Sequence, residues 1–522
     1  MLLSCLRPRR RRRSTLLLTI ACLAFIYLTA TSWRGHPGEV SWTPLQRVVE
    51  SVSDAANGAA TGHHFPKLLV SLLEQYPPGV SDHFHEKDAK SERWPPKKDQ
   101  GFMDRIELSP DEMSSMRRAH DRFLSTAERR LPRYAPLATG PTDGIVMVGG
   151  GSYFPPLMVS LRMLRRTGTT LPVEIFLPED EYEQQLCEAV LPTLHAKCVT
   201  FESRSSGNIS ISHYQYKVFA ILFSSFENIL WVDADVALLQ DASILFSAPP
   251  FVETGLVTWP DIWRTTISPL YYNISSQPAT PVMARASSET GQLLVSKSRH
   301  WKTLLLAAYY NYYGPGKYYS LLCQGGAGCG DKDTFLPAAG AVGLPFYDVK
   351  AAAQPVGHFK TLEVQKKSKN VFIFALIQGD PAEDYEITQH LEKLGADRDS
   401  ETDYDRVRPF FLHMSMPKWD ARTLLSQKGT YDVTRGPGRA RTAAFKDPPS
   451  TAAKIRGVER MVWEETRWVA CHLEYELRSW QGQEGQICKN MEAYFSEFLD
   501  ARKGAKLGLG KDDALLPALQ NP

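Results

Sequence analysis

The sequence predicts an α/β fold whose core is a mixed, mostly parallel β-sheet with flanking helices. Short apolar strands alternate with amphipathic helices between residues 144 and 191, a pattern typical of parallel sheets. A second observation is the tightly bounded apolar run Ile229–Val232, which predicts a buried strand that ends in two carboxylates. The composition, 43% hydrophobic and 23% charged over 522 residues, is ordinary for a globular protein with one large domain and appendages, or two domains.

The N-terminus predicts a membrane anchor. Six arginines within residues 1–13 precede an uncharged stretch, residues 14–33, that has roughly the length needed to cross a bilayer. Because only Arg34 closely follows this stretch, we expect the tail in the cytoplasm and the remaining chain on the lumenal side. A cleaved signal peptide is the alternative. Without the tail the chain is slightly acidic, which argues against nucleic acid as a partner of the folded part.

Two further features fit a lumenal, oxidising environment. Asn208–Ser210 and Asn273–Ser275 match the acceptor pattern for N-glycosylation. Six of the eight cysteines lie beyond the predicted anchor in close pairs, which suggests disulfides: Cys187 with Cys198, Cys323 with Cys329, and Cys471 with Cys488. None of these pairs has the spacing of zinc ligands, so we expect no zinc site.

The regions on either side of the predicted sheet differ in composition. Residues 34–105 are rich in Pro, Ser, Gly, Lys and Asp and predict a stem. A helix is expected at Asp111–Arg130, after Pro110, and we place the lumenal domain at residues 106–426. Residues 427–522 predict a basic loop followed by a helical, tryptophan-containing extension that carries the last cysteine pair.

A glycine turn follows the first predicted strand of the sheet. The pattern predicts, in order, a strand at 144–148, a helix at 157–166, a strand at 173–177 and an acidic helix at 179–191. Gly149, Gly150 and Gly151 match neither the P-loop nor the dinucleotide fingerprint. They leave the backbone free to approach a ligand, and Tyr153 is available to stack on a base.

Two aspartates separated by one alanine follow the strand Ile229–Val232. Asp233 and Asp235 would lie at the carboxyl end of the strand, where open α/β sheets bind their ligands. A buried carboxylate without a partner is costly, and a hard divalent cation bound to phosphate oxygens would satisfy both of them. The alternative is that the two aspartates only cap the loop. Lys217, near the start of the helix predicted at Val218–Phe226, is a candidate for stabilising phosphate charge.

The later part of the chain combines aromatic residues with carboxylates and amides. Residues 255–349 are rich in tyrosine, tryptophan and glycine, as sugar-binding sites are, although an aromatic core with turns explains any one segment equally well. A last strand, Arg408–His413, places His413 at its end, with Lys418 shortly after it. Such a histidine is more often structural, but neutral imidazole is also a common metal ligand.

With these residues in view, the chain resembles the fungal Golgi mannosyltransferases that build α-linked mannose branches on glycoproteins. They are a type II membrane family with a GT-A-like, Rossmann-like domain. The resemblance covers about residues 140–420 and is carried by Gly144–Gly168, Tyr214–Asp235, Gly255–Tyr271, Ser287–Trp301, Ala307–Phe335 and Phe411–Trp419. It is greatest to the α-1,2 branching enzymes, and α-1,3 relatives share much of the pattern. It implies a Golgi location with a lumenal catalytic domain.

The resemblance also implies the ligands and their contacts. It implies GDP-mannose as donor, Mn²⁺ as the metal and a mannose-containing glycoprotein glycan as acceptor; a complex with other Golgi mannosyltransferases is a further expectation. Asp233 and Asp235 match the metal motif, His413 resembles a third ligand, and Lys418 resembles a diphosphate-binding lysine. The chain lacks the glycine that distant relatives carry between these last two residues. Polar residues around the transferred sugar are expected at Asp331, Asp333, Glu289 and Gln292.

The implied reaction is transfer with retention of the α configuration. The departing phosphate oxygen can accept the proton of the acceptor, so no specific general base is expected, and Asp333 is the carboxylate expected to stabilise the oxocarbenium-like sugar. A lumenal lectin that has lost transfer is an alternative, which the intact Asp-x-Asp beside a glycine turn disfavours. A glycosidase would need two carboxylates flanking the scissile bond, and no pair stands out. The sequons, lumenal cysteines and single span disfavour a nucleotidyltransferase.

Overall fold

The computed structural model describes residues 65–81, 88–96, 101–131, 140–205, 210–364, 367–395, 404–425, 433 and 442–496. All of them belong to the second of two compact units, Gly58–Pro522, and the first unit is Met1–Asn57. The predicted tail and anchor, residues 1–33, and the sequon at Asn208 lie outside the described residues. Within the described ranges, no helix combines the length and the apolar character that a membrane span needs.

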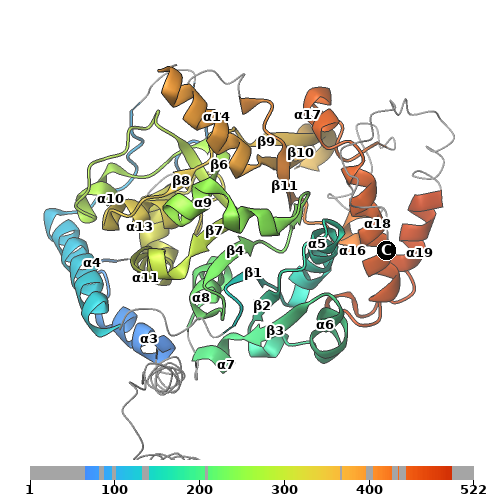
Figure 1. Ribbon diagram of the computed structural model, residues 1–522, viewed down its shortest axis with the longest axis horizontal. Helices are drawn as coiled ribbons and strands as arrows, with labels where there is room; N and C mark the ends of the chain where they lie inside the picture. The colour runs from blue at the N-terminus through green and yellow to red at the C-terminus, as the bar shows by residue number, and fades with distance from the viewer. Residues whose placement is uncertain are drawn as a thin grey trace, which may run out of the picture. The chain divides into compact units, whose positions relative to one another are not determined.

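A seven-stranded sheet lies at the centre of the described unit (Figure 1). Its strands are, in spatial order, β3 (Ala196–Thr200), β2 (Val173–Leu177), β1 (Asp143–Val148), β4 (Asn228–Val232), β7 (Ala286–Ser296), β6 (Leu256–Arg264) and β8 (Tyr347–Asp348). The first four strands are parallel, β7 is antiparallel to both β4 and β6, and β8 is parallel to β6. The predicted mixed, mostly parallel sheet with flanking helices is confirmed.

Helices cover both faces of this sheet, and alternation along the strands explains why. Ile145 of β1 and Leu230 of β4 pack in one apolar cluster with α5 (Phe154–Arg166). Their neighbours, Val146 and Ile229, point the other way and pack in a second cluster with α8 (Tyr216–Phe223) and α11 (Lys297–Tyr312). Because successive side chains of a strand point to opposite faces, continuous apolar runs such as Ile229–Val232 are buried on both sides.

The acidic helix predicted at 179–191 is wrong in part. The segment forms a single 3₁₀ turn at Glu179–Glu181, a π-helical turn at Leu186–Val190 and the short α6, Leu191–Thr193. Arg478 of the C-terminal extension accounts for the break. Its guanidinium donates to the carbonyls of Asp180 and Tyr182, and its backbone N–H donates to Glu183. A continuous helix would need those carbonyls for its own hydrogen bonds.

A second, four-stranded antiparallel sheet was not predicted. Its order is β5 (Val236–Leu238), β11 (Pro409–Met416), β10 (Lys367–Gly379) and β9 (Gln354–Val364). The prediction that a strand ends at His413 is wrong, because β11 continues to Met416 through pairing with β10. The chain passes from β4 of the first sheet to β5 of the second through Asp233–Asp235, so the Asp-x-Asp links the two sheets.

Segments outside the predicted lumenal core also pack onto it. Helix α3 (Phe65–Gln75), within the range predicted as a stem, buries Leu69 and Leu72 completely and packs against α4 (Pro110–Arg130). Helix α4 matches the helix predicted at 111–130. At the other end, α18 (Val458–His472) packs against α5, and α19 (Ile487–Tyr494) packs against α18 (Figure 1). Residues 442–496 of the C-terminal extension are therefore part of the packed core.

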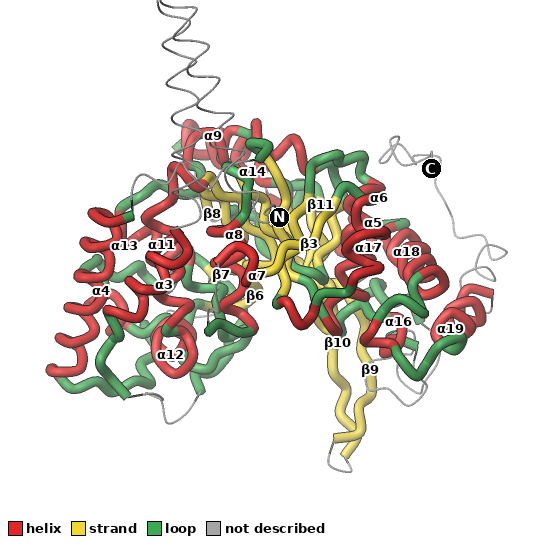
Figure 2. The backbone as a smooth tube through the Cα atoms, turned by 90° about the horizontal axis from the view of Figure 1, so that it is seen from below, coloured by secondary structure: helices red, strands yellow, loops and turns green. Residues whose placement is uncertain are grey.

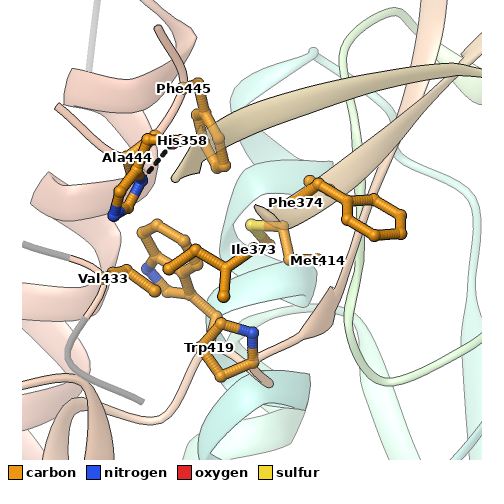
Figure 3. Close-up of a pocket in the computed structure, with 10 residues that line it drawn as sticks. His358, Ile373, Phe374, Met414, Trp419, Val433, Ala444 and Phe445 are labelled. Carbon is orange, nitrogen blue, oxygen red and sulfur yellow. Dashed lines mark hydrogen bonds between the residues drawn. The ribbon is translucent and has the colours of Figure 1, made fainter. Parts of the chain in front are cut away.

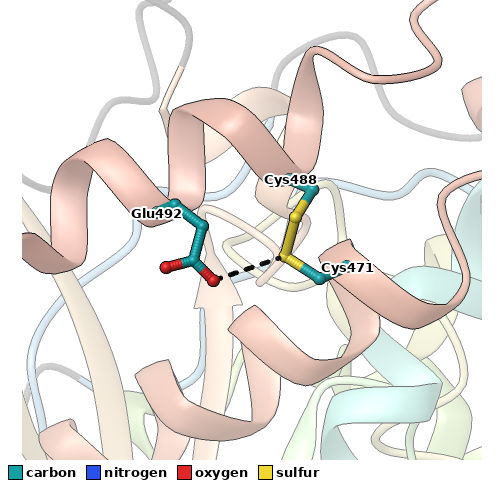
Figure 4. Close-up of side chains that lie close together, drawn as sticks. All are labelled: Cys471, Cys488 and Glu492. Carbon is teal, nitrogen blue, oxygen red and sulfur yellow. Dashed lines mark hydrogen bonds between the residues drawn. A yellow bond between two sulfur atoms is a disulfide. The ribbon is translucent and has the colours of Figure 1, made fainter.

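The three predicted disulfides are confirmed. They join Cys187 to Cys198, Cys323 to Cys329, and Cys471 to Cys488. The last one connects α18 to α19, and Glu492 lies beside it (Figure 4). Because both of these sulfurs are used in the disulfide, the three side chains do not form a metal site.

Glu174 of β2 holds the end of α8 and is predicted to matter for stability. Its carboxylate accepts from the hydroxyls of Ser224 and Ser225 and from the Ser225 N–H, at 2.6–2.9 Å, which ends the helix at Phe223 rather than at the predicted Phe226. Burial alone would raise the pKa of Glu174, but these hydrogen bonds and Lys197 outweigh it and lower the pKa below its ordinary value of 4.5.

Glu174→Gln is expected to lower the free energy of unfolding at neutral pH by about 1.5–3 kcal/mol, because hydrogen bonds to a charged group are lost. A carboxylate whose pKa is lowered by folding contributes stability above its unfolded pKa and loses it as the pH falls through the folded pKa. The difference between wild type and variant should therefore shrink below pH 4.5. Urea unfolding at several pH values measures it, and a difference that stays constant down to acid pH would contradict this account.

Candidate active site

The Asp-x-Asp is fixed to both sheets by its backbone. The N–H of Asp233 donates to the carbonyl of Gly291 on β7 at 2.7 Å. The carbonyl of Asp235 accepts from the N–H of Met414 on β11 at 2.8 Å. Each aspartate is thus held to a different neighbouring strand, and both side chains lie where the two sheets meet.

Asp235 lies between two cationic side chains. It is only 2% exposed; its Oδ1 is 3.2 Å from Nε2 of His413, and its Oδ2 is 2.6 Å from Nζ of Lys418. Burial alone would raise the pKa of Asp235, but His413 and Lys418 outweigh it and hold the pKa far below its usual range. Burial would likewise lower the pKa of His413, yet Glu289 and Asp235 hold it well above the ordinary value.

Asp233 shares a lysine with Asp331. Nζ of Lys217 lies 3.2 Å from Oδ1 of Asp233 and 3.0 Å from Oδ2 of Asp331, and it donates to Oγ1 of Thr290 at 3.0 Å. The same Oδ1 of Asp233 accepts from the indole N–H of Trp231 at 2.8 Å. Burial would lower the pKa of Lys217, but the two aspartates outweigh it and raise the pKa. Lys217 is buried and bridges the two carboxylates.

Glu289 contacts the other nitrogen of His413. Its Oε1 accepts from Nδ1 of His413 at 2.9 Å and from the N–H of Gly291 at 2.7 Å. Its Oε2 accepts from the amide of Gln292 at 2.7 Å and lies 3.4 Å from the amide nitrogen of Gln378. Burial would raise the pKa of Glu289, but His413 and these donors outweigh it and lower the pKa. Glu289 therefore orients His413 toward Asp235.

Asp333 and the glycine turn have contacts of their own. Asp333 is 1% exposed, and its two oxygens accept from the hydroxyl of Ser287 at 2.7 Å and the N–H of Ser288 at 3.0 Å. At the turn, Gly150 has a φ of 110°, and a Cβ there would collide with the carboxylate of Glu181. Tyr153 is 45% exposed, and Nζ of Lys418 lies 5.1 Å from the centre of its ring.

Comparison with known proteins is consistent with this site. The sequence model of a mannosyltransferase family matches residues 142–286 and 280–380. The α-1,2-mannosyltransferase MNN24 of Candida albicans is 34% identical over 396 residues, 64% of this chain and 55% of that protein. The α-1,2-mannosyltransferase MNN5 of Saccharomyces cerevisiae is 33% identical over 342 residues, 55% of this chain and 57% of that protein. Over residues 142–380 the chain is similar to this mannosyltransferase family.

The match to these family members is partial along the chain. The chain spans 55–57% of the length of the curated relatives MNN24 and MNN5. Among solved structures, the glycosyltransferase GlyE of Streptococcus pneumoniae TIGR4 is 10% identical with a TM-score of 0.28, covering 40% of this chain and 45% of that one. The galactosyltransferase LgtC is 14% identical with a TM-score of 0.27, covering 40% and 74%. TM-scores this low support no conclusion about the fold or function of this chain.

The side chains of this site fit a divalent cation. Ligand atoms of Asp233, Asp235 and His413 all lie within 4.8 Å of one another. Two carboxylates and an imidazole suit a divalent metal that also takes oxygen ligands. The contact between Glu289 and Nδ1 leaves Nε2 as the His413 nitrogen that faces the aspartates. Carboxylate partners of this kind orient the histidine ligands of many metal sites.

Most of the predicted site residues lie close together. They form two sets of ion pairs: Asp233 and Asp331 share Lys217, while Asp235 contacts His413 and Lys418, and Glu289 contacts His413. Gln292 joins the second set through Glu289, and the two sets meet where ligand atoms of Asp233, Asp235 and His413 lie within 4.8 Å of one another. Asp333 is not in these ion pairs and is hydrogen-bonded to Ser287 of β7. The glycine turn approaches the ion pairs at Tyr153, whose ring lies beside Lys418. Lys217, expected beside phosphate, is enclosed by protein groups.

Sequence reasoning missed several residues of the site. Asp261 and Lys332 form a buried ion pair of 2.9 Å, and Gln378 connects the carbonyl of Pro260 with Glu289. Gln378 could have been found by the pattern that identified Asp233, because each is a polar residue at the end of an apolar run. Asp261 lies in an aromatic segment that sugar binding and an aromatic core explain equally well from sequence.

Gly291 is required for the approach of His413. A Cβ at this position would lie 2.7 Å from Nδ1 of His413 and 2.8 Å from Oε1 of Glu289, both closer than real Cβ contacts. Gly291→Ala is therefore expected to displace the imidazole and reduce the catalytic activity of the site about 100-fold, since misplacement by about 1 Å costs that much. Steady-state kinetics measures the change, and circular dichroism shows whether the variant is folded. Activity within twofold of wild type would contradict the prediction.

Proposed function

We propose that this protein is a metal-dependent, retaining α-1,2-mannosyltransferase that moves mannose from GDP-mannose to a mannose residue of a glycoprotein glycan. The observation that carries the proposal is the convergence of Asp233, Asp235 and His413 in a chain similar to this family. The relatives named as α-1,2-mannosyltransferases support that linkage over α-1,3. A sheet of four parallel strands joined by the Asp-x-Asp to a smaller antiparallel sheet supports a GT-A-like domain.

The residues around Asp235 would hold the metal and the donor. Asp233, Asp235 and His413 would bind Mn²⁺, which when bound supplies positive charge opposite the departing diphosphate. Lys418 can stabilise the negative charge of the departing diphosphate, because its side chain is 45% exposed while its ammonium group contacts Asp235. Tyr153 presents an exposed ring beside Lys418 on which a base can stack. Lys217 orients Asp233 and Asp331 and is not in a position to bind phosphate.

The transferred mannose would lie on the β7 side of the metal. Asp331 is the buried partner of Lys217, and burial raises its pKa while Lys217 opposes that effect. Retention needs no dedicated protein base, since the departing phosphate oxygen can accept the proton of the acceptor hydroxyl. Asp333 supports Ser287 and Ser288 of β7, two residues before Glu289 and Thr290. Its expected contact with the oxocarbenium-like sugar stays a prediction.

We also propose that the enzyme resides in the Golgi membrane as a single-pass type II protein. The arginine-rich tail, the apolar stretch at 14–33 and the sequons support this location. The three disulfides fit an oxidising compartment. A complex with other Golgi mannosyltransferases is a further part of the proposal.

A transfer assay tests the function. Purified protein incubated with GDP-mannose, Mn²⁺ and a defined mannose oligomer is expected to release GDP and extend the oligomer by α-1,2-linked mannose, identified by NMR of the product. An α-1,3 linkage in the product would correct the linkage alone. Binding of the oligomer with no GDP release would overturn the enzyme assignment in favour of a lectin.

A further inference from the structure

One face of the second sheet extends from the candidate active site along the β9–β10 hairpin. Leu376 of β10 pairs with His413 of β11, so the two side chains share a face. Gln378, on that same face, reaches Glu289. In the other direction the alternation of β10 places Phe374 and then Phe372 on this face, and Phe359 of β9 pairs with Phe372.

These three phenylalanines form an aromatic stripe, defined as Phe359, Phe372 and Phe374. Ring centres are 5.1 Å apart between Phe359 and Phe372 and 5.8 Å apart between Phe372 and Phe374. Phe359 is 52% exposed, and the other two rings are partly exposed. Burying apolar aromatic surface is favourable, so a run of exposed rings on one face marks a surface that binds something.

The opposite face of β10 is already occupied. Ile373 packs with Met414 and Trp419, and Figure 3 shows the ring of Phe374 on the other side of the strand from Trp419. The stripe is therefore turned away from the C-terminal extension, toward the side on which Glu289 and His413 lie.

The inner end of the stripe is anchored next to the site. Phe374 and Trp263 both pack on the small buried cluster Ile262, Ala353 and Leu376. Gln378 donates to the carbonyl of Pro260, two residues before Ile262. Continuous contact thus runs from Glu289 through Gln378 to the cluster under Phe374. Figure 2 shows the outer parts of β9 and β10 extending beyond the other strands.

We propose that the aromatic stripe binds the sugar residues of the acceptor that lie beyond the reacting mannose. Flat apolar rings bind the C–H faces of sugars, and equivalent side chains on one strand repeat about every 6.8 Å, so successive rings can support successive parts of a chain. The stripe makes a long, linear mannose oligomer a better acceptor than a single mannose. This inference rests on the proposed function, because it assumes a mannose acceptor at His413.

The test compares acceptor lengths in a double variant, Phe372→Ser/Phe374→Ser. Wild type is expected to have a higher kcat/KM for a linear mannose hexamer than for methyl α-mannoside. In the variant the ratio of the two kcat/KM values should fall about tenfold or more, because two stacking contacts are lost. Tyr475→Ala, which removes a 74% exposed ring from the C-terminal extension, should leave the ratio unchanged. Circular dichroism and thermal unfolding report whether the hairpin variant is folded.

A direct binding measurement separates this inference from the proposed function. Titration of the hexamer without donor, followed by calorimetry, should give weaker binding in the double variant than in wild type even if neither protein transfers mannose. Failure of transfer with stripe-dependent binding would overturn the function and leave the stripe supported. Equal ratios and equal hexamer affinities in variant and wild type would overturn the stripe. A change confined to self-association in light scattering would also overturn the stripe, because it would indicate a protein-docking surface.

If the double variant does not fold, Phe374→Trp is the substitute test. It keeps an aromatic ring and should retain the hexamer preference, and loss of that preference would overturn the proposal.

Discussion

Replacing both Asp233 and Asp235 with alanine is expected to abolish mannose transfer, with a loss on the order of 10³-fold or more. The two side chains supply two of the three ligand atoms that lie within 4.8 Å of one another. His413 and Lys418 cannot replace them, because an imidazole and an ammonium group supply no carboxylate oxygen for a hard cation. Mn²⁺ binding, measured by electron paramagnetic resonance without donor, should be lost together with transfer.

The fold of this double variant should persist. Lys418 is partly exposed and can be solvated by water, and His413 keeps its contact with Glu289. Circular dichroism should therefore match wild type, and Asp111→Ala, an exposed carboxylate on α4, is the matched control with normal transfer. Normal transfer by the double variant would refute the metal assignment.

Lys217→Met is expected to lower the free energy of unfolding by about 3–5 kcal/mol, the cost of leaving a buried ion pair without one partner. The side chains of Lys217 and Asp331 are 8% and 7% exposed, so the carboxylate of Asp331 would be left buried beside Asp233 with no cation between them. Urea unfolding measures the change. Transfer should fall as well, because Asp233 loses the group that orients it.

A second substitution shows whether charge is the cause. Lys217→Met/Asp331→Asn should recover part of the lost stability, because the uncompensated carboxylate is removed, and the double-mutant cycle gives the coupling energy. Lys302→Met, which removes a half-exposed lysine paired with Glu128, should change stability by less than about 1 kcal/mol. If Lys217→Met is as stable as this control, Lys217 does not hold the two aspartates.

The local elements of the first sheet were predictable because their signals are local. The strands at 144–148, 173–177 and 229–232 are apolar runs bounded by turns, and the structure places strands at each. The disulfides were predictable from close spacing of cysteines. The helix predicted at 179–191 failed because Arg478, about 300 residues away, takes its carbonyl groups. Spacing along a chain contains no information about such a donor.

Sequence by itself determined which residue types the site holds. They are the Asp-x-Asp at the end of a buried strand, the glutamate of β7, the aspartates of the loop after α12 (Tyr319–Cys323), the histidine of the last strand and the lysine that follows it. Tertiary structure alone decided which of them touch. Glu289 faces His413 because β7 and β11 belong to different sheets that meet at Asp233–Asp235, and Lys217 faces inward because α8 packs under β4. The physical reason is that burial forces each charge to find a partner, and the partners available are set by strand order, which no local pattern encodes.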